Sequence, residues 1–404
     1  MSEWKKIRLS EVITDIAAGP FGSNLPKSCF IESGFPIVDG ANLKGFQITD
    51  NITKFVPEEK ARSLQRSIAK RGDVIVTISG TVGQISYIPE TSKYSEYLVS
   101  QRQFRCSFDS SMVDVPYLVY YFHSFEGSNK ILQFANQVGV PALSQPLKNF
   151  RNIQLALPLL AEQKKISAIL SSLDDKIETN RKINARLEEL AQALFKSWFI
   201  DFEPFGGQMP KDWEASNFDD AIEVIAGGTP KTEVKEYWDG DIPWISVKDF
   251  VNETHFVMNT ERYISQKGLD NSSTHLLNPD DTIISARGTV GAIAQIQVPM
   301  AFNQSCFGLR CKLNNGAHWL FYLIHNKVAE LRQKSHGSVF DTINRKTLSD
   351  LQIAVPTSEI LSKFHFIISP IVEKSLLLSK ESARLAALRD ALLPKLMTGE
   401  LIPE

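Results

Sequence analysis

Two stretches of the chain carry apolar or small residues at alternating steps of four and three, the spacing that lines up side chains along one seam of a helix. The first stretch follows Pro158 and the second follows Pro356, and proline is common at a helix start. We therefore expect two long helices over residues 159–200 and 357–393. The predicted seam positions are Ile166, Leu170, Leu173, Ile177, Leu187, Ala191, Leu194 and Trp198 in the first, with Asn180 and Asn184 between them, and Phe364, Ile367, Ile371, Leu378, Leu385, Leu388 and Leu392 in the second, with Lys374 and Glu381.

Each of these helices is too apolar on one side to stand alone in water. Sliding the first by 198 residues overlays Ile166 on Phe364 and Leu194 on Leu392, so the helices are repeats of each other. We expect them to pack as an antiparallel, coiled-coil-like pair in which the polar seam residues fix the register. Pro370 predicts a kink in the first third of the second helix. The alternative is two separate helices, each packed on its own domain.

Residues 1–158 and 201–356, which lie outside the two helices, contain short β-rich runs bounded by Gly, Pro, Asn and Asp. Neither region alternates strand and helix regularly, so each predicts an α+β domain with a twisted, mostly antiparallel sheet. Residues 394–404 are expected to form a C-terminal tail. The predicted strands include Asp73–Ile78 and Asp281–Ser285, and the predicted short helices are Val115–His123 and His318–Lys334.

The two halves of the chain repeat one design in the same order. Gly80–Gly83 returns as Gly288–Gly291 at an offset of 208 residues. A period of this length far exceeds the roughly 20–50 residues of a solenoid unit, and it indicates a duplicated domain with a pseudo-two-fold repeat. Two similar domains separated by the helix pair can present two similar surfaces to a two-fold-symmetric partner such as DNA. The other repeated strings are Ile16–Gly19 with Ile225–Gly228, Phe104–Cys106 with Leu309–Cys311, and Leu155–Pro158 with Ile353–Pro356.

The composition narrows the class of protein. Apolar residues make up 43% and charged residues 22% of the chain. The sequence contains no run of eighteen apolar residues, so no membrane-spanning helix is expected. The N-terminus lacks a signal core, and the four cysteines lack Cys-x-x-Cys spacing, so we expect a cytoplasmic protein with buried thiols. The net charge is −2, yet residues 1–158 hold 17 Lys and Arg against 14 Asp and Glu. Any contact with DNA must then come from local basic loops, supplemented by a partner subunit.

Motifs of catalysis are absent from the sequence. It has no Asn/Asp-Pro-Pro-aromatic tetrapeptide of amino-methyltransferases, no Gly-x-x-x-x-Gly-Lys-Ser/Thr phosphate loop and no Gly-x-Gly-x-x-Gly. Pro279–Asp281 is similar to the opening of a nuclease motif, but Ser285–Arg287 follows where Glu-x-Lys is required. The seven histidines lack metal-ligand spacing. We therefore expect no catalytic activity, no cofactor and no metal.

Three groups of residues resemble the specificity subunit of type I restriction-modification enzymes. Ala193–Phe202 is similar to the end of that family's central conserved helix, and Leu388–Leu401 is similar to its C-terminal signature. The match covers essentially the whole chain, and the order and duplication of the motifs make it highly specific. The first domain departs from the pattern, with Ser79 in place of Arg287 and Ser100 in place of Asn303. The third group is similar to the family's target-recognition domain and consists of Gly227–Pro230, Tyr237–Gly240, Ile242–Asp249, Ser285–Gly291 and Asn303–Gln304.

The resemblance implies a reader of double-stranded DNA that has no catalytic activity of its own. Each domain would read one half of an asymmetric, split target, and the helices would set the unread gap. The helices would also dock two copies of a subunit that methylates adenine, and a restriction or translocase subunit would be a further partner. Two alternatives stay open from the residues alone: a stand-alone DNA-binding regulator with two readers, and a scaffold that binds only proteins.

Candidate DNA contacts are the polar, basic and glycine residues of the predicted loops. Arg reads guanine and Asn or Gln reads adenine, whereas Lys, Ser, Thr and exposed backbone N–H groups contact phosphates. The alternative for each is an ordinary capped turn or a solvated surface residue. Gly80, Gly83, Gly288 and Gly291 are instead expected to serve backbone geometry. The candidates are Gly19, Phe21, Ser23, Asn24, Lys27, Thr81, Gln101, Arg102, Ser144 and Gln145 in the first domain, and Gly227, Gly228, Thr229, Lys231, Arg287, Thr289, Asn303, Gln304, His336, Ser338, Asn344 and Arg345 in the second.

Three aromatic residues at the end of the first long helix, Trp198, Phe199 and Phe202, are candidates for a surface that binds the partner subunit. Aromatic side chains are common anchors at protein interfaces. The alternative is that they fill the local core where the helix meets the second domain.

Overall fold

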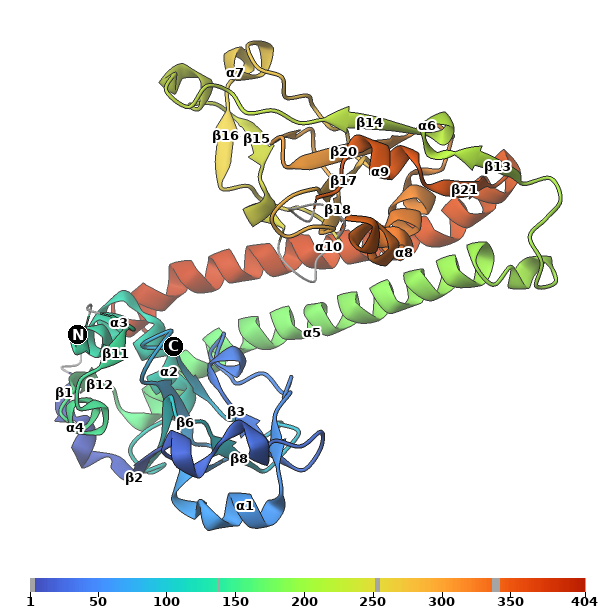
Figure 1. Ribbon diagram of the computed structural model, residues 1–404. Helices are drawn as coiled ribbons and strands as arrows, with labels where there is room; N and C mark the ends of the chain where they lie inside the picture. Colours follow the sequence, from blue (N-terminus) through green and yellow to red (C-terminus); the bar gives the residue numbers. More distant parts are fainter. Residues whose placement is uncertain (1–3, 137–138, 251–254, 336–341, 404) are drawn as a thin grey trace. The chain divides into compact units, whose positions relative to one another are not determined.

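The computed structural model describes residues 4–136, 139–250, 255–335 and 342–403. The chain forms two compact units. Unit 1 consists of Met1–Lys176 and Arg384–Glu404, and unit 2 consists of Ile177–Ala383. Figure 1 shows both units with their helices and strands labelled.

Unit 1 is built on a four-stranded antiparallel sheet in the order β2-β9-β6-β7. Its central strand Val74–Thr77 (β6) is wholly buried, as the predicted β-rich run of valine, isoleucine and threonine requires. A second sheet, β4-β3-β8-β5, contains one parallel pair, β3 with β8. The remaining elements are β1 (Lys5–Arg8) paired with β12 (Gln154–Leu157), β2 (Ile13–Ala18), β3 (Phe35–Val38), β4 (Phe55–Val56), β5 (Ile68–Lys70), β7 (Ile85–Tyr87), β8 (Glu96–Val99), β9 (Gln103–Phe108), the pair β10 (Ala135–Asn136) and β11 (Ala142–Leu143), and helices α1 (Glu58–Ser63), α2 (Val115–His123), α3 (Phe125–Leu132) and α4 (Pro146–Arg151).

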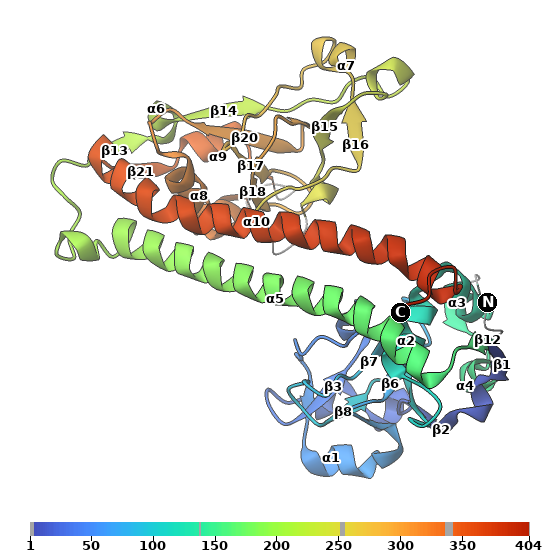
Figure 2. The ribbon, with the colours of Figure 1, turned by 180° about the vertical axis from the view of Figure 1, so that it is seen from behind.

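Unit 2 repeats this plan. Its four-stranded sheet has the order β14-β20-β17-β18, and its second sheet, β16-β15-β19, again contains one parallel pair. In both views helix α8 (Ala317–Ser335) lies between the four-stranded sheet and the long helix α10 (Ser358–Met397) (Figure 1, Figure 2). The elements are β13 (Glu214–Asn217) paired with β21 (Gln352–Val355), α6 (Phe218–Ala221), β14 (Ile222–Ala226), β15 (Ile242–Ile245), β16 (Arg262–Ile264), α7 (Gln266–Asp270), β17 (Thr282–Ser285), β18 (Ile293–Gln295), β19 (Ala301–Phe302), β20 (Cys306–Cys311), α8 (Ala317–Ser335) and α9 (Arg345–Ser349).

The duplication predicted from the sequence is confirmed, but two of the matched strings are out of register. Ala18 pairs with Phe104 and Ala226 pairs with Phe307, so Gly19 corresponds to Gly227 and not to Gly228. The register of β2 shifts between Ile13 and Asp15, and this bulge adds one residue to the first copy. The sequence alone does not reveal the bulge, because Ile16–Ala17 also matches Ile225–Ala226 in the shifted register.

The second misaligned string is Phe104–Cys106. Cys106 pairs with Val74, and the corresponding position opposite Thr282 is occupied by Leu309, not by Cys311. The two arginines matched by this string therefore occupy different positions on their strands. A three-residue string of common residue types can match by chance, and this match is two residues out of the register that the strand pairing gives.

The two long helices are α5 (Leu160–Phe199) and α10 (Ser358–Met397). In unit 1, Asp174 of α5 accepts a hydrogen bond from Arg389 of α10 at 2.6 Å. In unit 2, Asn180 donates to Glu381 at 2.8 Å, and Asn184 donates to Ser379 at 3.0 Å. The partner numbers fall as those of α5 rise, so the predicted antiparallel pairing is confirmed and the alternative of two separate helices is wrong.

The seam of α5 follows the prediction, and in α10 the predicted residues Phe364 and Leu378 are buried, but two other predicted positions of α10 are exposed. Ile367 and Leu388 were predicted to face the partner helix, yet they are 40% and 49% exposed. Ile368, which follows Ile367, and Leu393, which follows the predicted seam residue Leu392, are buried instead. The runs Phe366–Ile368 and Leu392–Leu393 place apolar residues side by side around the helix, so spacing alone does not choose between them. Helix α10 continues through Pro370 and ends four residues beyond the predicted boundary at 393. Within the described part of the chain, none of the helices combines the length and the apolar character that crossing a bilayer requires.

The corrected seam can be tested with two neighbouring residues of α10. Replacing Ile368, which is fully buried, by Ala removes core packing and should lower the free energy of unfolding by about 2–5 kcal/mol. Ile367→Ala, at an exposed position, should change it by less than about 1 kcal/mol. Urea denaturation of the two variants measures both values. Equal losses would contradict the corrected seam.

Candidate nucleic-acid interface

A group of turns meets at one end of the sheets in each unit. In unit 1 the β6–β7 turn and the β8–β9 turn are joined by a hydrogen bond from Ile78 N to Arg102 O at 2.7 Å. In unit 2 the corresponding bond runs from Ala286 N to Ser305 O, also at 2.7 Å. This hydrogen bond fixes the backbone of each turn, so exposed side chains at its tip remain available to contact a ligand.

The glycines of the β6–β7 and β17–β18 turns are required by backbone conformation. Gly80 and Gly83 have φ of +90° and +85°, and Gly288 and Gly291 have φ of +77° and +79°. Residues with a Cβ rarely adopt this left-handed region. The structure confirms that these four glycines serve geometry.

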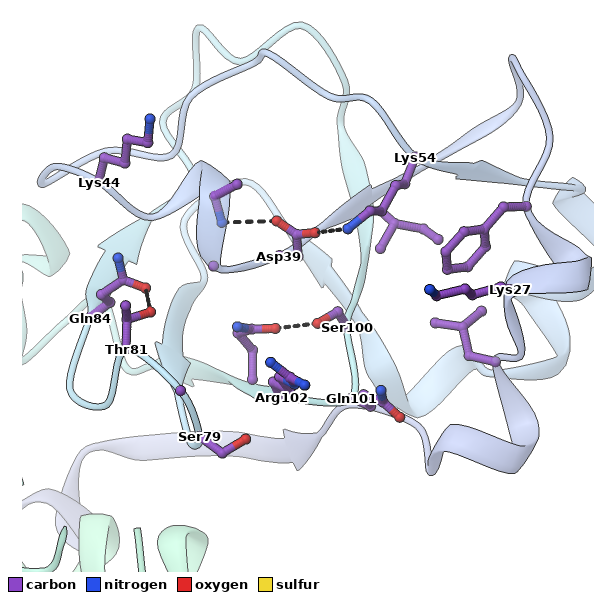
Figure 3. Close-up of a pocket in the computed structure, with 17 residues that line it drawn as sticks. Lys27, Asp39, Lys44, Lys54, Ser79, Thr81, Gln84, Ser100, Gln101 and Arg102 are labelled. Carbon is purple, nitrogen blue, oxygen red and sulfur yellow. Dashed lines mark hydrogen bonds and ion pairs between the residues drawn. The ribbon is translucent and has the colours of Figure 1, made fainter. Parts of the chain in front are cut away.

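The turns of unit 1 enclose a pocket with a volume of about 770 Å³ (Figure 3). Its charged lining residues are Lys27, Lys44, Lys54, Arg102 and Asp39. Asp39 forms an ion pair with Lys54, and among the described residues that line the pocket it is the only acid. The pocket therefore has an excess of positive charge, although the chain as a whole is slightly acidic.

Hydrogen bonds between side chains hold the polar groups of this pocket in place. Gln84 accepts from Thr81 at 2.6 Å, and the dashed line between them is visible in Figure 3. Gln103 accepts from Ser100 and donates to Thr77 at 3.4 Å. Side chains that are held before a ligand arrives lose little conformational entropy on binding.

Tryptophan side chains anchor the corresponding loop of unit 2. Trp244 donates its indole N–H to Gly228 O at 3.0 Å, and Trp238 donates to Lys231 O at 3.1 Å. The guanidinium of Arg262 lies 3.5 Å from the centre of the Trp238 ring. Thr229, in the same loop, is hydrogen-bonded to Gln304. Two tryptophan rings therefore hold the backbone of the loop at Gly228 and Lys231, which is the loop predicted to contact DNA.

The strands behind each site carry arginines that are already paired with acids. Arg105 donates to Asp15 at 2.5 Å, and this hydrogen bond lowers the pKa of the Asp15 carboxyl. Arg310 donates to Asp281 at 2.6 Å, which raises the pKa of the Arg310 guanidinium. Both arginines therefore belong to the scaffold.

The structure brings only some of the predicted contacts of unit 1 together. Lys27, Thr81, Gln101 and Arg102 line the pocket. Gly19 is a packing residue, because a Cβ there would lie 1.9 Å from Ser100 O. The candidates outside the pocket lining are Phe21, Ser23 and Asn24, which are exposed around the 3-10 turn after β2, and Ser144 and Gln145, which are exposed before α4.

The candidates of unit 2 also divide by their surroundings. Asn344 caps α9 by accepting from Thr347 N at 2.9 Å, so the ordinary capped turn describes this residue. Gly227 and Gly228 are packed against backbone, with Cβ positions 2.2 Å from Asn303 O and 2.4 Å from Thr274 N. His336 and Ser338 lie outside the described residues. The exposed candidates are Lys231, Arg287, Thr289, Gln304 and Arg345, with Thr229 and Asn303 partly exposed.

Several residues of these sites were missed in the sequence. Lys44, Lys54 and Gln84 line the pocket of unit 1, but they are isolated polar residues in separate loops and share no motif. Arg262 is separated by more than twenty residues from the tryptophan on which it stacks. Only the second sheet, which the chain pattern did not resolve, brings them together.

The three aromatic residues predicted to bind a partner pack within unit 2. The ring of Phe199 lies 4.8 Å from Phe364 and 5.6 Å from Trp213. Trp198 contacts Phe205, and Phe202 contacts Trp213. Phe199 is buried and the other two are partly buried, which favours the local-core alternative. A role for Trp198, Phe199 and Phe202 in partner binding stays a prediction.

Within the parts of the chain that the structure describes, three or more His, Cys, Asp or Glu side chains nowhere gather as metal ligands would. The groups that converge on the turns are instead hydrogen-bond donors and cations. Two copies of an α+β module, each with such a group of turns, define a class of duplicated-domain proteins.

The chain belongs to one family within this class. The model of the type I restriction modification DNA specificity domain matches residues 1–189 and 210–385. The chain is 26% identical over 361 residues to the type I restriction enzyme MjaIX specificity subunit of Methanocaldococcus jannaschii, covering 86% of this chain and 81% of that protein. It is 24% identical to the type I restriction enzyme HindI specificity subunit of Haemophilus influenzae, covering 99% of this chain and all of that protein.

A solved structure shares the fold. The S subunit of a type I restriction-modification system from M. genitalium superposes with a TM-score of 0.63 at 14% identity, covering 99% of this chain and 96% of that one.

The close approach at Gly19 leads to a prediction. Gly19→Ala would press a methyl group against Ser100 O and displace the β8–β9 turn, so we expect a loss of about 1–3 kcal/mol in the free energy of unfolding. Gly45→Ala is the matched control, because its nearest neighbour lies 4.0 Å from the new Cβ. Thermal unfolding compares the two, and an unchanged Gly19→Ala protein would show that the approach is not required.

Proposed function

We propose that the chain is a non-catalytic reader of a bipartite, asymmetric DNA target, with one half-site read by each unit. The observation that carries this proposal is the repeated group of turns, in which the backbone is the same in both units and the side chains at the tips differ. Turns with the same backbone and different side chains are suited to reading two different half-sites. Membership of the specificity-domain family supports the same function.

The chemistry of the turns suits a DNA groove. Lysines and exposed hydroxyls contact phosphates, which position a protein on the duplex, and arginine and glutamine contact base edges, which carry the sequence. Unit 1 supplies Lys27, Lys44 and Arg102, and unit 2 supplies Lys231 and Arg287. These local cations remove the objection raised by the net charge of −2.

The two long helices would set the unread gap. Each contains 40 residues and is roughly 60 Å long at about 1.5 Å per residue. The length of a continuous helix is fixed by its number of residues, so the length of the unread gap would be fixed as well. In this proposal the gap depends on α5 and α10, and the half-site sequences do not.

The reader would act in a complex with adenine methyltransferase subunits, two copies because the helices are repeats of each other. A restriction or translocase subunit is the further partner that the family implies. Helix α5 offers a docking surface in unit 2: Ile183 and Leu190 are 38% and 48% exposed beside Lys182 and Arg186. Together with Thr179 and Leu187 they line an apolar groove of about 380 Å³. We propose that a methyltransferase subunit occupies this groove.

Exchange of one domain tests the two-reader function. Residues 1–158 are replaced by the first domain of another family member, and the chain is expressed with its methyltransferase partner. Methylome sequencing should show one changed half-site, an unchanged second half-site and an unchanged gap. Simultaneous change of both half-sites would contradict the proposal, and so would an unchanged motif from a folded, active complex.

The docking surface has its own test. Leu190→Asp places a charge in the apolar groove, where a partner would have to desolvate it, so the variant should fold but no longer co-purify with the methyltransferase subunit. Leu159→Asp is the matched control, because that leucine is 80% exposed and lies outside the groove. Equal recovery of the partner with both variants would place docking elsewhere.

A further inference from the structure

An arginine and a serine occupy one pair of neighbouring positions in both units, but in opposite order. The bond from Ile78 N to Arg102 O corresponds to the bond from Ala286 N to Ser305 O, so Arg102 corresponds to Ser305. The residues that follow Ile78 and Ala286 are Ser79 and Arg287. Unit 1 thus carries its arginine on the β8–β9 turn, and unit 2 carries its arginine on the β17–β18 turn.

Two further features of the backbone support this correspondence. Gln103 N donates to Ser100 O at 3.1 Å, and Cys306 N donates to Asn303 O at 3.2 Å, so the two β8–β9-type turns have the same internal bond. The β6–β7 and β17–β18 turns share left-handed glycines directly after Ser79 and Arg287, at φ of +90° and +77°. The first equivalence does not depend on sequence similarity, and the second agrees with the repeat of Gly80–Gly83 as Gly288–Gly291.

The two positions are close enough for one guanidinium to replace the other. Arg287 N lies 3.3 Å from Ser305 O. In unit 1, Nη1 of Arg102 lies 3.8 Å from the Cβ position of Gly80, so its guanidinium reaches over the neighbouring turn. Figure 3 shows Arg102 beside Ser79 on the same side of the pocket. An arginine entering from either turn therefore reaches the same region.

Both guanidinium groups are available for a ligand. Arg102 and Arg287 are exposed, and neither side chain forms a hydrogen bond or an ion pair with any residue that the structure describes. Arg105 and Arg310, on the strands behind them, are held by Asp15 and Asp281.

We propose that Arg102 and Arg287 are counterparts, each reading one guanine in the half-site of its own unit. The inference rests on the proposed function and adds its chemistry. A guanidinium donates two parallel hydrogen bonds to O6 and N7 of guanine in the major groove, which distinguishes guanine from the other bases. The serine at the facing position is small, so it leaves room for the arginine that crosses from the other turn.

The test measures binding by the chain in complex with its methyltransferase partner, on native duplexes and on duplexes changed at single half-site positions. Arg102→Ala should lose about 10- to 100-fold of discrimination at one guanine of the first half-site and leave the second half-site unchanged. Arg287→Ala should do the same in the second half-site only. Thermal unfolding checks that both variants fold.

Relocation of the arginine is the stricter arm. The double variant Ser79→Arg with Arg102→Ser should restore the preference for the same base pair, because the guanidinium then enters from the other turn. The control restores the charge elsewhere, with Ser63→Arg in the Arg102→Ser chain. Ser63 is exposed at the end of α1, so this control should restore no base preference.

The outcomes separate the two levels of the argument. If Arg102→Ala weakens binding equally on all sequences and reduces the salt slope by about one, the arginine contacts phosphate and the inference fails while the two-reader function stands. If the relocated arginine restores no preference, the correspondence of the two turns fails. If domain exchange leaves the motif unchanged, the proposed function fails first.

Discussion

The hydrogen bond between two neighbouring turns, Ile78 N to Arg102 O in unit 1 and Ala286 N to Ser305 O in unit 2, is the contact on which the turns of each proposed recognition face depend. It uses only backbone atoms, as does the close approach at Gly19. The exposed side chains of Arg102 and Arg287 take no part in holding the turns. They can therefore differ between the units at little cost in stability, which is the property that a protein with two different half-sites requires.

The pairing of the two long helices depends on contacts between side chains. Within unit 2, Asn180 is fully buried and donates to Glu381, while its Oδ1 has no donor among the described residues. A buried polar group with an unmet bond costs stability, and such a group in a helical seam fixes the register. Here side chains determine the geometry, whereas at the turns backbone hydrogen bonds act together with anchoring side chains such as Trp244. In the proposed function, the helix pair must keep one register, whereas the turns must accept different side chains at their tips.

Much of this architecture could be predicted from the sequence, because it depends on periodicity. Helix α2 has the predicted bounds, Val115–His123, and the seam of α5 carries the predicted residues. The predictions that were wrong or incomplete concern single residues or pairs of residues that are distant in sequence. The bulge after Ile13 shifted one alignment, and adjacent apolar residues hid the choice between Ile367 and Ile368. Lys44, Lys54 and Arg262 became site residues only through contacts between strands that are remote in sequence, so no local pattern could identify them.

The central claim is that one chain holds two separate readers at a fixed spacing. Single-molecule methylome sequencing of cells that express the native chain with its methyltransferase partner tests it most directly. The account predicts one methylated motif with two specified, unequal halves around a gap of constant length and unspecified sequence. A continuous motif, a palindromic motif of two equal halves, or two halves at variable spacing would contradict it.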